Sequence, residues 1–166
     1  MSAITIRPER AGDEAIIHEL TEAAFRDMPF SEGDEQELVD ALRNDGDLTL
    51  SLVAEDGMRI VGHIAFSPVA ISDGTLDWYD LGPVSVWPKL HGQGIGSALV
   101  RRGIADMRAK GAKGIVLLGS PDYYGRFGFE HDPHLQYPGP PPEYFQRLVL
   151  DGPAPSGIVR YVPAFG

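Results

Sequence analysis

The fold is decided by one stretch of the sequence, Asp80-Leu-Gly-Pro-Val-Ser-Val-Trp-Pro-Lys-Leu-His-Gly-Gln-Gly-Ile-Gly-Ser-Ala-Leu-Val-Arg-Arg-Gly103. Val84 and Val86 alternate with other residues, which is typical of a strand, and Pro88 ends it. Glycine then occupies every second position from 92 to 96, and the residues that follow carry an apolar stripe at helical spacing. The stretch therefore predicts a strand, a glycine turn and a helix in immediate succession.

A glycine turn at the start of a helix favours an anionic ligand. Glycine lets the backbone approach a ligand closely, and the unpaired N–H groups of the first helical turn attract a phosphate. Two common phosphate-binding patterns do not fit, however. A dinucleotide fingerprint needs glycine where Ser97 stands, and a triphosphate loop needs Lys and Ser or Thr after Gly96, where Ser97 and Ala98 follow.

A third pattern fits better, and a second motif accompanies it. The run His91-Gly-Gln-Gly-Ile-Gly96 resembles the Arg/Gln-x-x-Gly-x-Gly/Ala turn that binds pyrophosphate in the GNAT N-acetyltransferase superfamily, with His91 in place of the first residue. The run Ser120 to Phe129 is similar to the tyrosine-bearing turn of that superfamily, and it follows the apolar segment 115–118. Residues 140–145, together with 30–42, resemble the YhbS-like group within it.

The resemblance implies an α/β fold. Its expected form is the GNAT acyltransferase fold, with a mixed central sheet of about seven strands, about four helices and a V-shaped splay between strands 4 and 5. We expect one N-acetyltransferase domain over residues 1–166, because this length suits a single core.

Hydrophobic periodicity and turn residues place the other elements. A strand is expected at 4–7, then a helix capped by Gly12-Asp13 and a second helix that opens at Ser31 and ends at Asn44-Asp-Gly46. A hairpin around Glu55-Asp-Gly57 and several further strands follow. The expected strands are 48–55, 59–71, 115–118, 144–150 and 158–162, with residues 131–143 as a proline-rich loop.

Composition excludes several classes of protein. The chain has no cysteine, so disulfides, thiolate metal sites and cysteine nucleophiles are absent. It opens without an apolar signal region and has no apolar run of membrane-spanning length, so we expect a cytoplasmic protein without membrane contact.

Charge is separated along the chain, whose net charge is −10. Residues 1–56 hold fifteen acids against four bases, whereas residues 89–113 hold six bases against one acid. The basic segment suits the phosphates of coenzyme A. The acidic half suits either a cationic acceptor or simply a solvated helical surface, and the overall sign disfavours nucleic acid.

The resemblance assigns the residues that hold acetyl-CoA, the expected co-substrate. Backbone groups of Leu81 to Val86 would contact the pantetheine, with Val84, Ser85 and Val86 nearest the thioester. Amide groups of the glycine turn would hold the pyrophosphate; the residues concerned are His91, Gly92, Gln93, Gly94, Ile95, Gly96 and Ser97.

It also assigns two catalytic roles. Tyr124 matches the tyrosine that protonates the departing thiolate, with Tyr123 as the structural alternative. A primary amine of pKa near 10.4 is deprotonated in only about one molecule in 2,500 at pH 7, a cost of roughly 4.6 kcal/mol, so a general base is expected. Asp80, at the start of strand 4, matches the base of one branch, although a solvated carboxylate at a strand end is an equal interpretation. Glu35 and His134 are weaker candidates.

The acceptor is expected to be a cationic primary amine, on a small molecule or on a protein. Phe30, Glu32 and Glu35 fall where the superfamily closes over its acceptor. No metal is expected, because His131 and His134 in a proline-rich loop lack a further ligand pattern. A homodimer is implied only by resemblance. The alternative function is a sensor that binds CoA or acyl-CoA without turnover.

Overall fold

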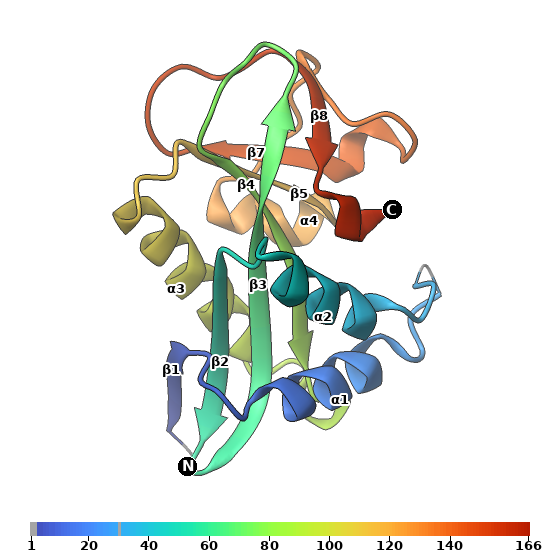
Figure 1. The fold of residues 1–166 in the computed structure, drawn as a ribbon, viewed down its shortest axis with the longest axis vertical. Helices are drawn as coiled ribbons and strands as arrows, with labels where there is room; N and C mark the ends of the chain where they lie inside the picture. The colour runs from blue at the N-terminus through green and yellow to red at the C-terminus, as the bar shows by residue number, and fades with distance from the viewer. Residues whose placement is uncertain (1–2, 30) are drawn as a thin grey trace. The chain divides into compact units, whose positions relative to one another are not determined.

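The computed structural model describes residues 3–29 and 31–166. They gather in two compact units, each built from two segments of the chain (Figure 1). The first unit comprises Met1–Phe66 and Gly82–Ala105, and the second comprises Ser67–Leu81 and Asp106–Gly166. Strands β3 (Arg59–Ile71) and β4 (Trp78–Val86) each contribute to both units.

The first unit contains an antiparallel meander. Strand β1 (Ile4–Pro8) pairs with β2 (Leu50–Asp56), and β2 pairs with the first part of β3. The turn between β2 and β3 uses Gly57 at φ +65°, which confirms the predicted hairpin.

Two helices follow β1 in the chain. In α1 (Glu14–Phe25) the buried residues recur at helical spacing, as they do in α2 (Glu35–Asp45). Ile17 of α1 and Val39 of α2 form a buried cluster with Val53 of β2. The helices therefore bury their apolar stripes within this unit.

The predicted start of the second helix is wrong, whereas the first helix begins where it was predicted, after Asp13, but without a side-chain cap. The second helix begins at Glu35 rather than at Ser31, because the Ser31 hydroxyl donates to the Glu35 carboxylate at 2.7 Å and accepts from the Gly33 N–H at 3.0 Å. Asp13 precedes α1 but does not cap it with its side chain, since its carboxylate accepts from Arg7 at 2.8 Å and from the Arg10 N–H at 2.7 Å. The predicted end at Gly46 is confirmed by its left-handed conformation, φ +78°.

A partly buried chain of polar groups, which ends at the fully buried His63, lies in the first unit. Arg43 donates to both oxygens of Glu9 at 2.9 Å, and the Ser51 hydroxyl donates to the same carboxylate at 2.6 Å. The Ser51 oxygen lies 2.8 Å from Nε2 of His63. Because the Ser51 proton is already given to Glu9, Nε2 must be the protonated nitrogen, and burial lowers the pKa of His63 to about 4.

Helix α3 (Ile95–Ala109) packs closely on β3 in the first unit, as predicted from its apolar stripe. A Cβ on Gly103 would lie 2.5 Å from Cε1 of Phe66, and one on Gly62 would lie 3.0 Å from Cδ1 of Leu99. These two glycines therefore allow the helix and the strand to approach each other.

The second unit contains the parallel pair that the resemblance implied. The start of β4 runs parallel to β5 (Gly114–Leu118) over three residue pairs, from Trp78↔Gly114 to Asp80↔Val116. Strand β5 pairs antiparallel with β7 (Phe145–Val149), and β8 (Gly157–Tyr161) pairs antiparallel with the end of β3. Helix α4 (Pro121–Tyr124) follows β5. The result is the mixed α/β GNAT fold.

One strand of the sheet was not predicted. Strand β6 (Leu135–Gln136) pairs parallel with β8, so eight strands are described rather than about seven. It lies in the segment 131–143, which the sequence indicated only as a proline-rich loop. Two residues are too few to show an alternation of apolar and polar side chains.

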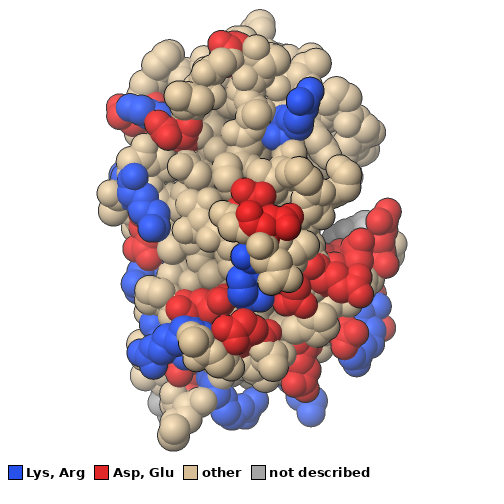
Figure 2. Space-filling view, viewed as in Figure 1, with Lys and Arg blue, Asp and Glu red and all other residues tan. Residues whose placement is uncertain are grey.

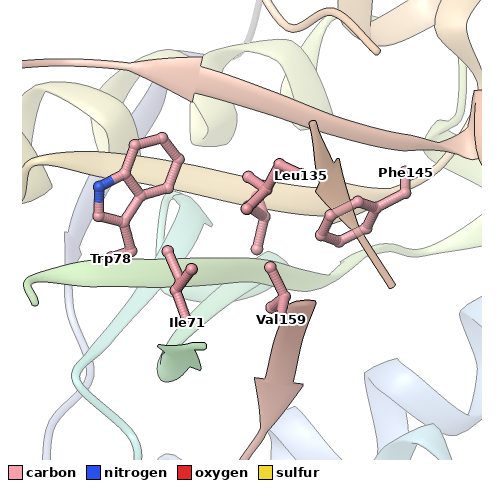
Figure 3. Packing of buried hydrophobic residues seen from close by; sticks show 6 residues of the cluster. Ile71, Trp78, Leu135, Phe145 and Val159 are labelled. Carbon is pink, nitrogen blue, oxygen red and sulfur yellow. The ribbon is translucent and has the colours of Figure 1, made fainter. Parts of the chain in front are cut away.

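The core of the second unit lies among these strands. It is made of Ile71, Trp78, Val116, Leu135, Phe145 and Val159, all 5% exposed or less (Figure 3). A Cβ on Gly114 would overlap the indole ring of Trp78, so only glycine leaves room for that ring. In neither unit is a described helix both long and apolar enough to cross a membrane.

Candidate functional site

The glycine turn has the geometry that an anion requires. A single turn of 3-10 helix (Pro88–Leu90) leads into it, and Gly92 and Gly94 adopt φ values of +82° and +83°. No described residue beyond their chain neighbours comes within 4 Å of where a Cβ of either glycine would stand. Helix α3 begins directly afterwards at Ile95, so the N–H groups of its first turn lie next to this uncrowded glycine backbone.

His91, which replaces the usual arginine or glutamine, closes this turn by its own contact. Its Nε2 lies 2.8 Å from the carbonyl oxygen of Val86, the last residue of β4. A carbonyl can only accept, so Nε2 carries the proton. The imidazole thereby ties the end of β4 to the start of the turn.

The end of β4 is also tied to β3 within the first unit. The Trp87 N–H donates to the carbonyl of Val61 at 3.2 Å, and its indole N–H donates to that of Ile60 at 3.1 Å. Among the predicted contact residues, Ser85 is 1% exposed, and its hydroxyl has no hydrogen-bond partner among the described residues. A buried hydroxyl without a partner is unusual in a folded protein.

Tyr124 is the last residue of α4 and lies in an aromatic cluster. Its ring centroid is 4.9 Å from that of Tyr123, 6.1 Å from Phe127 and 6.2 Å from Phe129. Burial, followed by the charges of Tyr123 and Asp80, raises the pKa of Tyr124 to about 12. Its phenol is therefore a proton or hydrogen-bond donor throughout the range in which enzymes work.

Tyr123, the alternative donor, has a different environment. The guanidinium carbon of Arg126 lies 4.4 Å from its ring centroid, and Nε of Arg126 donates to its carbonyl at 2.8 Å. Through this cation–π contact, the ring of Tyr123 has a structural role.

The interpretation of Asp80 as a solvated carboxylate at a strand end is wrong, because the side chain is buried. Asp80 is the third residue of β4 and only 4% exposed. Burial raises its pKa well above the ordinary value, and interaction with the hydroxyl of Tyr161 opposes this in part. Its negative charge in turn acts on Tyr124, so the two predicted catalytic side chains lie in one electrostatic neighbourhood of the second unit.

Tyr161 is a site residue that the sequence did not indicate. Its buried hydroxyl interacts with Asp80, yet it makes no hydrogen bond of standard geometry within the part of the chain that is described. Its ring stacks on Tyr137 at 4.7 Å and 12° and meets Phe165 edge-on at 4.8 Å. The pairing of β8 with β3 sets its position, and no local motif signals that pairing.

Gln146 is a second residue that sequence reasoning missed. It lies on β7, is 1% exposed, and donates from Nε2 to the carbonyl of Gly119 at 2.9 Å. Gly119 directly follows β5 and precedes the turn that carries Tyr124. An isolated glutamine in a strand gives no sequence signal for such a contact.

The predicted acceptor residues fall between α1 and α2 in the chain, except Glu35, which is the first residue of α2. Phe30 is outside the described residues. Glu32 is exposed, whereas the Glu35 carboxylate accepts from the Ser31 hydroxyl. Acidic side chains gather over the α1–α2 segment on the face shown in Figure 2.

His134, a weaker candidate for the base, contacts Asp132 through its backbone N–H. Asp132 accepts from Nε of Arg147 at 3.0 Å and from the N–H of His134 at 2.9 Å, which orders the loop. Across residues 3–29 and 31–166, no group of three or more His, Cys, Asp or Glu residues is placed to hold a metal ion.

Known proteins resemble this chain over most of its length. The acetyltransferase (GNAT) domain family matches residues 5–131. The uncharacterized N-acetyltransferase YhbS of Escherichia coli K12 is 37% identical over 139 residues, covering 80% of this chain and 83% of its own. A GNAT family acetyltransferase from Brucella melitensis, solved in complex with acetyl-CoA, is 48% identical with a TM-score of 0.89, and each chain is covered fully. E. coli YhbS, solved in complex with CoA, has a TM-score of 0.90 at 34% identity, covering 99% of this chain and 93% of its own. The chain belongs to the GNAT family of N-acetyltransferases.

Proposed function

We propose that this acetyltransferase moves the acetyl group of acetyl-CoA directly to a primary amine. The observation that carries the proposal is the pair formed by Tyr124 and Asp80. Burial, and after it the charges of Tyr123 and Asp80, raise the pKa of the Tyr124 phenol to about 12, and burial raises the pKa of the Asp80 carboxyl. Two titratable groups with strongly shifted pKa values in one neighbourhood are typical of a catalytic site.

The glycine turn fits acetyl-CoA. Its open backbone at Gly92 and Gly94 leaves space for a pyrophosphate, and the N–H groups from Gly92 to Ser97 supply the donors. The ligand supplies an acetyl group activated as a thioester. Val84, Ser85 and Val86 remain the proposed backbone contacts next to it, and similar proteins have been solved with acetyl-CoA or CoA.

Asp80 is the proposed general base. When ionised, it accepts a proton from the ammonium group of the acceptor, which leaves a neutral amine whose lone pair forms the bond to the acetyl carbon. Because burial raises its pKa, the ionised carboxylate is a stronger base than a solvated one. A cationic acceptor would favour that ionised form.

Tyr124 is the proposed general acid. As the carbon–sulfur bond breaks, the phenol O–H gives its proton to the sulfur. The nitrogen loses its second proton as the amide forms, and that proton restores the Tyr124 phenol. The proton on Asp80 is released to solvent, one for each acetyl group transferred.

The acceptor is proposed to be a cationic amine of unassigned identity. Glu32 and Glu35 are its proposed contacts, on the acidic surface over the α1–α2 segment. A single N-acetyltransferase domain, a homodimer and a cytoplasmic location remain predictions.

Two linked measurements test the function. Calorimetry with acetyl-CoA should give a dissociation constant in the micromolar range, and a panel of primary amines should then release free thiol. Acetyl-CoA binding without thiol release from any amine would favour a sensor. Absence of binding would overturn the role of the glycine turn.

A further inference from the structure

The buried amide of Gln146 secures the backbone directly after β5. Its Nε2 donates to the carbonyl of Gly119 at 2.9 Å, while the Gly119 N–H donates to the carbonyl of Tyr144 at 3.0 Å. Both polar groups of this glycine are therefore bound to residues at the start of β7 or just before it. The backbone is held beyond Leu118, where the strand itself ends.

Gly119 in turn supports Tyr124 in two ways. A Cβ on Gly119 would lie 2.5 Å from Cε2 and 2.8 Å from Cδ2 of Tyr124, so the ring rests directly on the glycine backbone. The next residue, Ser120, accepts from the Tyr124 N–H at 3.0 Å and so begins the turn that carries the tyrosine. A shift of the Gly119 peptide would move both the surface under the ring and the base of its helix.

A glutamine at position 146 leaves one of its polar atoms buried without a partner in the described part of the chain, and filling space in the core does not require such a residue. The Gly119 carbonyl needs a donor, which fixes the orientation of the amide and leaves Oε1 buried without a partner among the described residues. Burying an acceptor without a donor destabilises a fold. An apolar side chain of similar size would fill the position without that cost, so the bond to Gly119 is the feature that a glutamine supplies.

We propose that Gln146 is a positioning residue for the proton transfer to sulfur. By holding the Gly119 backbone, it keeps the phenol of Tyr124 aligned with the atom that the phenol protonates. The inference rests on the proposed role of Tyr124 as acid. Misplacement of a catalytic group by about 1 Å can cost on the order of a hundredfold in rate.

The test is Gln146→Met, which keeps the volume and removes the donor. We expect kcat to fall about ten- to a hundredfold, while the dissociation constant of acetyl-CoA and the thermal midpoint stay near the wild-type values. The matched control is Gln136→Met, because Gln136 is exposed and donates only to the carbonyl of Pro133 at 3.2 Å. An unchanged kcat in Gln146→Met would overturn the proposal, as would an equal fall in the control.

A second variant covers the case in which Gln146→Met fails to fold. Gly119→Ala keeps the glutamine but pushes on the Tyr124 ring from below, so kcat should fall while acetyl-CoA binding persists. Wild-type turnover in Gly119→Ala would contradict the dependence on this support.

A double-mutant cycle separates this inference from the function on which it rests. If Gln146 acts through Tyr124, adding Gln146→Met to Tyr124→Phe should change kcat less than twofold. A further tenfold loss would overturn the inference while leaving the acid role intact. If Tyr124→Phe alone keeps full turnover, the acid role fails. The aromatic NMR signals of Tyr124 then decide the positioning, because signals unmoved by Gln146→Met would refute it.

Discussion

At the scale of single residues, the candidate site contains the Asp80 carboxyl, whose burial disfavours its charged form. Asp80 is 4% exposed, and burial raises its pKa well above the ordinary value. A base must be ionised to act, so the role proposed for Asp80 requires the form that burial disfavours. The same residue should therefore limit stability and support activity.

Asp80→Asn tests this opposition. The folded-state pKa of Asp80 lies above the unfolded one, so the wild type loses unfolding free energy as pH rises between those two values, by up to about 1.4 kcal/mol per unit of difference. Asparagine lacks this loss, and we expect a higher thermal midpoint at pH 8 than in the wild type, with little difference near pH 4. Activity should fall, and the rise of kcat/KM with pH should disappear. A variant that retains that rise would exclude Asp80 as the base.

His63 gives the opposite pH dependence in the first unit. Burial lowers its pKa to about 4 in the folded protein, against about 6.5 unfolded, so its neutral form stabilises the fold above pH 6.5. That stability is lost as pH falls toward 4. Linkage predicts a decrease of roughly 2 kcal/mol in unfolding free energy between pH 7 and 4.5.

Denaturant unfolding at these two pH values measures the decrease. His63→Gln keeps a donor for the Ser51 oxygen but does not titrate. Its unfolding free energy should therefore fall by roughly 2 kcal/mol less than that of the wild type over the same pH change. Equal decreases in both proteins would contradict a buried neutral imidazole.

At the scale of elements, the glycine turn combines an open backbone with a helix start. Gly94→Ala should weaken acetyl-CoA binding about five- to tenfold, because alanine at φ +83° is strained by roughly 1–2 kcal/mol and its methyl group enters the space left open for the ligand. Calorimetry measures the change. Gly57→Ala is the matched control, since Gly57 also has a positive φ, +65°, but lies in the β2–β3 hairpin. An affinity loss of the same size in both variants would point to a general loss of folding instead.

Strand β5 depends on a glycine for packing rather than for conformation. Gly114→Ala should destabilise the protein by about 3 kcal/mol, because its Cβ would overlap the ring of Trp78 in the core of the second unit (Figure 3). Gly125→Ala, which meets open space, should change the unfolding free energy by less than about 0.5 kcal/mol. Denaturant unfolding compares the two, and equal stabilities would refute the packing role.

At the scale of the whole molecule, the sequence predicted what local chemistry determines. The β2–β3 hairpin, the end of α2 at Gly46 and the helix after the glycine turn each follow from glycine placement and hydrophobic period. The predicted start of α2 was wrong because the hydrogen bond from Ser31 to Glu35 holds the residues before Glu35 outside the helix.

The residues that complete the site could not be predicted in the same way. Tyr161 reaches Asp80 through the pairing of β8 with β3, and Gln146 reaches Gly119 through the register of β7 on β5. These contacts join residues 81 and 27 positions apart in the chain. Burial of Asp80 is likewise a product of tertiary packing, so its position in a strand did not reveal it.

The most direct test of acetyl transfer through Tyr124 is a single-turnover measurement with labelled acetyl-CoA and an amine acceptor. The wild type and Tyr124→Phe are compared at acetyl-CoA concentrations that saturate both proteins. We expect labelled amide to form about 10²–10⁴-fold more slowly in the variant, the usual contribution of a general acid, with the dissociation constant of acetyl-CoA changed less than about twofold. Equal transfer rates in the two proteins would contradict the mechanism.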